Sequence, residues 1–67
     1  MKIILNNKEE EFNAEQFTIN ELLKVKNFTF KMLVIKVNNQ LIKKSEYPTA
    51  VVKDGDDVMV LHLISGG

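Results

Sequence analysis

The stretch VMVLHLISGG, residues 58–67, organises the rest of the chain. Its first part is strongly apolar, which predicts a β-strand. Successive side chains of a strand point to opposite faces of the sheet. The two faces are Val58, Val60 and His62 on one side, and Met59, Leu61 and Leu63 on the other. Both faces are apolar near the middle, and a covering helix can bury only one of them. The other face needs a different explanation.

A diglycine, Gly66-Gly67, ends the stretch directly after Ser65. Glycine has no Cβ, so it gives the most slender and conformationally permissive peptide. A flexible tail of this kind can be threaded into a partner site that bulkier residues would block. We therefore expect a domain over residues 1–64 and a flexible tail over residues 65–67, with the carboxylate of Gly67 as the functional group.

Composition restricts the remaining possibilities. The chain has 67 residues, enough for one small core, and no cysteine, so disulfides, thiolate metal sites and cysteine nucleophiles are excluded. All nine cations are lysines, balanced by nine acids, which argues against a nucleic-acid partner. No apolar run approaches the ~20 residues of a membrane helix. We expect a cytoplasmic protein with no membrane partner.

The N-terminal half predicts a hairpin and a helix. Two short strands are predicted, Lys2–Asn6 and Glu9–Asn13, with a turn at Asn7-Lys8 between them. The glutamates of the second strand indicate that it lies at an exposed edge of the sheet. Thr18-Ile19-Asn20-Glu21 fits a capping box, which predicts that a helix starts at Thr18. The apolar residues that follow Thr18 recur at the spacing of one helix face, and Asn27 is the predicted end of this helix.

The C-terminal half predicts three further strands. Alternation of side chains between two faces indicates a strand over Leu33–Val37. A turn at Asn38-Asn39 then leads into a short strand over Gln40–Ile42. Residues 43–49 are irregular, and an Asp54-Gly55-Asp56 turn precedes the final strand. A helix with one apolar stripe must bury it on a sheet, so the fold class is α+β in two layers.

Residues that could carry chemistry are few in the body of the chain. His62 is the single histidine, and it has no evident partner for catalysis. Asp54, Asp56 and Asp57 lack the spacing of a calcium loop, and turn propensity explains them better. We therefore predict no catalytic residue, no metal site and no bound cofactor: the chain is not an enzyme.

The uncovered face of the last strand is a candidate partner surface. Met59, Leu61 and Leu63 share that face, and Ile4 of a neighbouring strand can extend it. A contiguous apolar patch of this kind is typical of a protein interface. We predict that these four residues bind a partner.

The whole chain resembles the ubiquitin-like sulfur carriers, specifically the ThiS family of thiamine biosynthesis. The motifs behind the resemblance are Thr18–Leu23, Ile35–Ile42, Asp54–Asp56 and Ser65–Gly67. The resemblance implies a β-grasp fold, a mixed sheet of four to five strands packed on one main helix. It also implies that the first and last strands are parallel neighbours in the middle of the sheet.

The resemblance further implies the chemistry of Gly67. An E1-like adenylyltransferase (ThiF-like) would use ATP and Mg²⁺ to form an acyl-adenylate on the terminal carboxylate. Sulfur from a persulfide donor would then displace AMP and leave a thiocarboxylate. That group would donate sulfur to a thiazole synthase (ThiG-like), with ATP and Mg²⁺ belonging to the activating partner.

Three alternatives remain open from the sequence. A molybdopterin-synthase-type sulfur carrier would use the same terminal chemistry with a pterin-forming partner. A ubiquitin-like protein modifier would form isopeptide bonds with lysines of other proteins. A β-grasp interaction module with an inert tail would keep its activity without Gly66 and Gly67.

Overall fold

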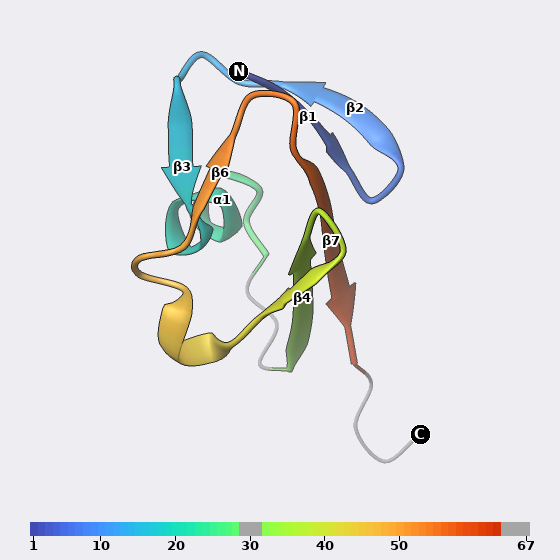
Figure 1. Cartoon of the computed structure of the whole chain (residues 1–67), viewed down its shortest axis with the longest axis vertical. Helices are drawn as coiled ribbons and strands as arrows, with labels where there is room; N and C mark the ends of the chain where they lie inside the picture. Colours follow the sequence, from blue (N-terminus) through green and yellow to red (C-terminus); the bar gives the residue numbers. More distant parts are fainter. Residues whose placement is uncertain (29–31, 64–67) are drawn as a thin grey trace.

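The computed structural model describes residues 1–28 and 32–63 and contains one α-helix and seven strands in that part of the chain (Figure 1). Ser65, Gly66 and Gly67 lie outside the described residues, as does the domain boundary predicted after Ile64. The elements are β1 (Lys2–Leu5), β2 (Lys8–Glu11), β3 (Gln16–Thr18), α1 (Ile19–Val25), β4 (Leu33–Val37), β5 (Gln40–Ile42), the 3₁₀ turn η1 (Lys44–Glu46), β6 (Val51–Lys53) and β7 (Asp57–His62).

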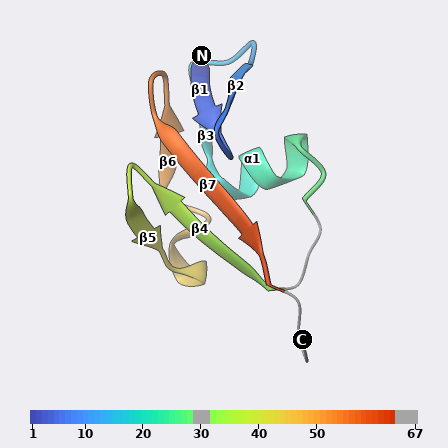
Figure 2. The same ribbon diagram turned by 90° about the vertical axis from the view of Figure 1, so that its right-hand side faces the viewer.

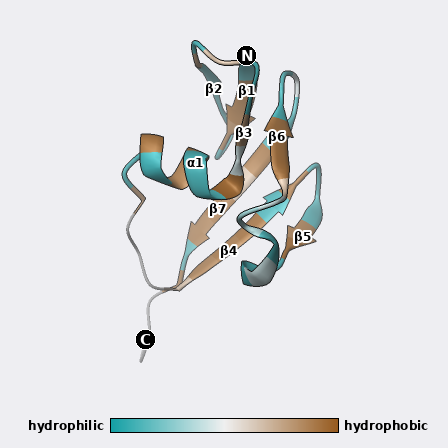
Figure 3. Cartoon of the chain, turned by 90° about the vertical axis from the view of Figure 1, so that its left-hand side faces the viewer, coloured by the Kyte–Doolittle hydropathy of each residue, from teal (hydrophilic) through white to brown (hydrophobic). Residues whose placement is uncertain are grey.

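A five-stranded mixed sheet forms one layer, with strand order β2-β1-β7-β4-β5. Strands β1 and β7 pair in parallel at its centre, and every other neighbour in this sheet is antiparallel. Helix α1 lies against one face of the sheet (Figure 3). The predicted α+β class, strand count and central parallel pair are confirmed.

A second, two-stranded sheet was not predicted. Strands β3 and β6 pair antiparallel, with Phe17 opposite Val52. Each strand has only three residues, too few for alternation to reveal them. Val52 is nonetheless fully buried, so this small sheet closes one side of the core.

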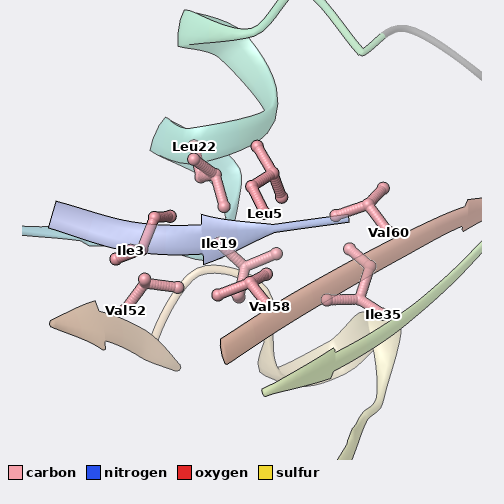
Figure 4. Close-up of a cluster of buried hydrophobic side chains, with 8 residues drawn as sticks. All are labelled: Ile3, Leu5, Ile19, Leu22, Ile35, Val52, Val58 and Val60. Atoms are coloured by element: carbon pink, nitrogen blue, oxygen red, sulfur yellow. The ribbon is translucent and has the colours of Figure 1, made fainter. Parts of the chain in front are cut away.

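The core lies between α1, the small sheet and the helix-facing side of the large sheet (Figure 4). Alternate residues of β1, β4 and β7 point into it, which confirms the predicted inward face of the last strand for Val58 and Val60; His62 is exposed. In the part of the chain that the structure describes, eight hydrophobic side chains are buried: Ile3, Leu5, Ile19, Leu22, Ile35, Val52, Val58 and Val60.

The predicted capping box starts the helix. The backbone N–H of Glu21 donates to Thr18 Oγ1 at 3.1 Å, and the Thr18 N–H donates to Glu21 Oε1 at 2.8 Å. The helix ends at Val25, and the Lys26 ammonium at its C-cap binds both carboxylate oxygens of Glu10 at 2.7 and 2.8 Å. The prediction of a solvated glutamate edge is therefore wrong for Glu10, since this pair is partly buried and joins β2 to α1.

Asparagine pairs make both hairpin turns. Asn6 and Asn7 have φ of 52° and 68°, and Asn38 and Asn39 have φ of 51° and 67°. Asparagine tolerates the left-handed region better than most residues, and two such residues in succession fit the twist of a tight hairpin. The first turn is thus centred on Asn6-Asn7, one residue earlier than the Asn7-Lys8 turn predicted from the sequence.

Asn6, directly after β1, also binds strand β7 through two hydrogen bonds. Its backbone N–H donates to the carbonyl of Val58 at 2.9 Å, and its side-chain Oδ1 accepts the N–H of Val60 at 2.8 Å. The asparagine side chain therefore continues the β1–β7 pairing for one more hydrogen bond. This contact holds β7 in place upstream of the tail.

Asn6→Ala is expected to lower the free energy of unfolding by about 2–4 kcal/mol. The change leaves the partly buried Val60 N–H without its acceptor. It also places alanine in a left-handed conformation that asparagine tolerates better, because the short polar side chain of asparagine can form local hydrogen bonds. Asn6→Gly is the control, because glycine adopts the same φ without strain. This variant loses only the side-chain hydrogen bond, so its free energy of unfolding should fall by about 1–3 kcal/mol. Urea unfolding measures both values, and wild-type stability of both variants would show that the contact is unimportant.

Candidate functional site

Figure 2 shows the large sheet with β7 and β4 in front of α1. On the face turned away from α1, four strands carry apolar residues: β1, β7, β4 and β5. Since Ile3, Leu5, Ile35, Val58 and Val60 point toward the helix, their strand neighbours point outward. The register places Val34 opposite Leu61, and Lys36 between Met59 and Leu41. We call this set the docking face: Ile4, Val34, Lys36, Leu41, Met59 and Leu61.

Exposure distinguishes this face from the core. Ile4, Leu41 and Leu61 are 37%, 57% and 47% exposed, whereas the inward residues Ile3 and Leu5 of β1 and Val58 and Val60 of β7 are at most 7% exposed. Met59 and Val34 are half-buried among them. Large apolar side chains so exposed and so close together are typical of a surface that a partner covers.

Leu63 lies directly after β7 and lines a hollow together with Val34 and Leu41 of the docking face and with Leu23 and Phe28. Its N–H donates to the carbonyl of Met32 at 3.0 Å, so the backbone is still held to the neighbouring segment. Its side chain is 45% exposed. The structure thus brings together the four residues predicted to bind a partner, Ile4, Met59, Leu61 and Leu63, on or directly beside one exposed surface.

Sequence reasoning missed three members of the docking face: the apolar residues Val34 and Leu41, and the cation Lys36. The signal for Val34 was present, because a strand that is apolar at every position except Lys36 must expose some apolar side chains. Leu41 belongs to a three-residue strand, too short for its outward direction to be read from alternation. Their addition widens the surface from the sheet centre to the β5 edge.

The aspartates of the turn before β7 bind backbone and side-chain groups of the protein itself. Asp54 Oδ1 accepts the N–H of Lys2 at 2.7 Å. Asp56 accepts the N–H of Lys53 at 2.9 Å through Oδ2 and the side-chain amide of Asn38 at 3.1 Å through Oδ1. These contacts support the interpretation of Asp54 and Asp56 as turn residues. No group of three or more potential metal ligands occurs among residues 1–28 and 32–63.

A hollow of about 560 Å³ opens between the end of α1, β4 and η1. Its lining is mostly apolar, with Lys43, Lys44 and Tyr47 as the polar residues. Partial burial raises the pKa of the Tyr47 hydroxyl above its ordinary value, so the group stays neutral and can donate a hydrogen bond at physiological pH. Phe28 and Met32 are among its apolar lining residues.

Strand β7, which leads into the predicted tail, is hydrogen-bonded to a neighbouring strand along most of its length. Strand β7 pairs with β4 along five residue pairs, from Val58 opposite Val37 to His62 opposite Leu33. The predicted site at Gly67 lies outside the described residues, four residues beyond Leu63. Four residues can span at most about 14 Å, so this length of chain limits how far Gly67 can lie from Leu63. Within the described ranges, no helix is long and apolar enough to span a bilayer.

Comparison with known proteins gives consistent matches along the whole chain. The profile of the ThiS family matches residues 2–67. The sulfur carrier protein ThiS of Escherichia coli is 27% identical over 67 residues, which cover both chains completely. A thiazole synthase of Paramagnetospirillum magneticum is 30% identical over 67 residues, and the chain spans about a fifth (20%) of its length.

Solved structures give the same result for the fold. The crystal structure of a thiamine biosynthesis protein, ThiS, from Geobacter metallireducens matches with a TM-score of 0.90 at 26% identity, over the full length of both chains. A solution structure of a thiamine biosynthesis protein from the same organism matches with a TM-score of 0.81 at 26% identity, covering all of this chain and 88% of the other.

Proposed function

The chain belongs to the ThiS family, and on that premise we propose that it is a sulfur carrier for thiamine biosynthesis whose cargo is bound at the carboxylate of Gly67. The observation that carries this proposal is the family match over residues 2–67, which includes the terminal Gly66-Gly67 pair. The β-grasp fold and the exposed docking face support it. They provide a rigid body and a partner surface beside the start of the tail.

The proposed chemistry assigns catalysis to partner proteins. A carboxylate is a poor electrophile, so an E1-like partner with ATP and Mg²⁺ converts it to an acyl-adenylate and releases pyrophosphate. A persulfide sulfur then attacks the acyl carbon and AMP leaves; reductive cleavage of the resulting acyl disulfide by a thiol gives the thiocarboxylate. This chain acts as substrate and carrier throughout, and its own task is to present Gly67 to each partner in turn.

A thiazole synthase is the proposed acceptor of the sulfur. In the Paramagnetospirillum magneticum protein, a segment similar to this entire chain is part of a polypeptide named for thiazole synthase activity. A carrier and its acceptor must meet for sulfur to pass between them, and joining them in one chain raises their effective concentration. The same pairing of carrier and acceptor is what we propose here.

A mass measurement tests the proposed function. The full chain is incubated with the cognate adenylating enzyme, ATP, Mg²⁺ and a persulfide donor with a reducing thiol. The C-terminal peptide is expected to gain the mass of one oxygen-to-sulfur exchange, and the gain should disappear without ATP. No gain with an enzyme active on another carrier would reject the proposal. Isopeptide adducts on other proteins would identify a modifier, and transfer to a pterin-forming synthase would identify a molybdopterin carrier.

Leu61→Asp is expected to weaken binding to the adenylating enzyme by about 30-fold or more, since a buried interface position can contribute about 2 kcal/mol. Leu61 is exposed, so the free energy of unfolding should change by only about 0.5 kcal/mol. Val25→Asp is the matched control, because Val25 is similarly exposed, at 54%, but lies on α1. Calorimetry measures the affinities, and equal affinities of the two variants would exclude the docking face from this contact.

A further inference from the structure

Lys36 occupies the centre of the docking face. On β4 it lies between Met59 of β7 and Leu41 of β5 in the strand register, and Val34 precedes it on the same face. It is therefore a cation with apolar neighbours along its strand and across both adjacent strands.

Lys36 has no ion-pair partner within residues 1–28 and 32–63. The side-chain ion pairs in those ranges are Lys2 with Glu9 and Lys26 with Glu10. Asp57 is the acid that lines the same surface depression of about 300 Å³ as Lys36, together with Met59. It forms no ion pair with Lys36 there, and its backbone N–H binds the side chain of Asn38.

Covering this face changes the environment of the ammonium. A protein surface that packs on Met59, Leu41 and Val34 removes water from the lysine between them. An ammonium group that loses water without gaining an acceptor is strongly unfavourable, whereas a carboxylate placed against it compensates for the lost hydration. Asp57 lies in the same depression but forms no ion pair with Lys36, so a partner that fits the apolar residues binds best if it also supplies a negative group at this position.

Resting on the proposed function, we propose that Lys36 determines which partner docks, and that the adenylating enzyme presents a carboxylate to it within an otherwise apolar contact. Surfaces that are neutral or positive at this point are rejected, because they leave the cation buried and unpaired. The chain has a formal net charge of zero, so selection depends on this local pairing rather than on long-range attraction.

Affinity measurements with the full chain and the adenylating enzyme test the proposal. Lys36→Met should weaken binding about 30-fold or more, and Lys36→Glu should weaken it further, as expected when one member of a desolvated charge pair is lost. Lys53→Glu is the control, because it changes the net charge equally on β6 of the small sheet. Its affinity should stay within a few-fold of the wild type. Thermal unfolding verifies that each variant is folded.

A zero-length cross-link tests the contact itself. A carbodiimide joins an amine and a touching carboxylate as an amide, with water transferred to the reagent. Peptide mapping of the cross-linked complex should find Lys36 joined to an Asp or Glu of the enzyme. Lys36→Arg should keep most of the affinity, because the guanidinium still pairs with a carboxylate, but should lose the cross-link.

The outcomes separate this proposal from the proposed function. Wild-type affinity in Lys36→Met, or a cross-link map without Lys36, overturns the role of Lys36. If the wild-type chain still forms the thiocarboxylate in that case, the carrier function stands. Failure of the wild-type chain to form it overturns both. Sedimentation showing that the chain dimerises through this face, and that Lys36→Glu separates the copies, would assign the face to self-association instead.

Discussion

Deletion of Gly66 and Gly67 is expected to abolish thiocarboxylate formation and leave the stability of the domain unchanged. The deletion moves the terminal carboxylate back along the chain by about 7 Å. A misplacement of only ~1 Å at a reacting centre can cost about 100-fold in rate, so no product should be detectable. The eight buried residues found among residues 1–28 and 32–63 all precede Leu61, and the deleted residues are two glycines without side chains, so the unfolding midpoint in urea should match that of the full chain.

Ser65→Ala is the matched control for this deletion, because it changes the same tail but keeps its length and its diglycine. We expect a rate of thiocarboxylate formation within a few-fold of the wild type. The rate of thiocarboxylate formation by Gly66→Val should lie between those of the deletion and of Ser65→Ala, since a branched side chain obstructs a site that accepts a glycine backbone. Mass spectrometry of the C-terminal peptide measures all three. Sulfur transfer by the deletion variant at the wild-type rate would show that the tail is inert.

Local sequence signals predicted the elements whose own residues determine them. The capping box needs only Thr18 and Glu21, and its two reciprocal hydrogen bonds are present in the structure. The hairpin turn at Asn38-Asn39 likewise follows from the tolerance of asparagine for positive φ. The inward and outward faces of β7 followed from strand alternation, because six consecutive residues are enough to fix a period of two.

Features that depend on distant partners were missed. Strands β3 and β6 exist because Phe17 meets Val52 across the chain, and neither three-residue segment indicates a strand alone. The Glu10–Lys26 pair joins residues that are 16 positions apart, and nothing local distinguishes Glu10 from the glutamates beside it. The width of the docking face depends on β5 lying beside β4, which brings Leu41 next to Lys36.

The predicted identity of the functional residues has a different basis from the predicted fold. Alternation in β7 and its pairing with β1 explain why Ile4, Met59 and Leu61 are on one exposed face. Exposure alone does not reveal what binds there. The role of Gly67 rests on the resemblance to sulfur carriers and on the family match over residues 2–67. The tail deletion and the Leu61→Asp variant therefore test separate parts of the proposal.

Val58→Asp is expected to unfold the domain. Val58 is completely buried in the core, at the point where β7 pairs with both β1 and β4. A carboxylate there has lost its water, and the buried cluster around it is apolar, so the penalty should exceed about 4 kcal/mol. A 67-residue domain has a total stability of only about 3–10 kcal/mol. Circular dichroism and the dispersion of amide NMR signals should both show the loss of structure.

Leu61→Asp supplies the matched comparison, because it places the same carboxylate three residues along the same strand but on the exposed face. It should keep the native spectrum. Burial raises the pKa of a carboxyl group, so the stability deficit of Val58→Asp relative to wild type should shrink as the pH falls and the aspartic acid becomes neutral. Unfolding of Leu61→Asp, or a native spectrum for Val58→Asp at neutral pH, would contradict the assignment of the two faces. In that case the docking face would have to be placed elsewhere, since its position follows directly from that assignment.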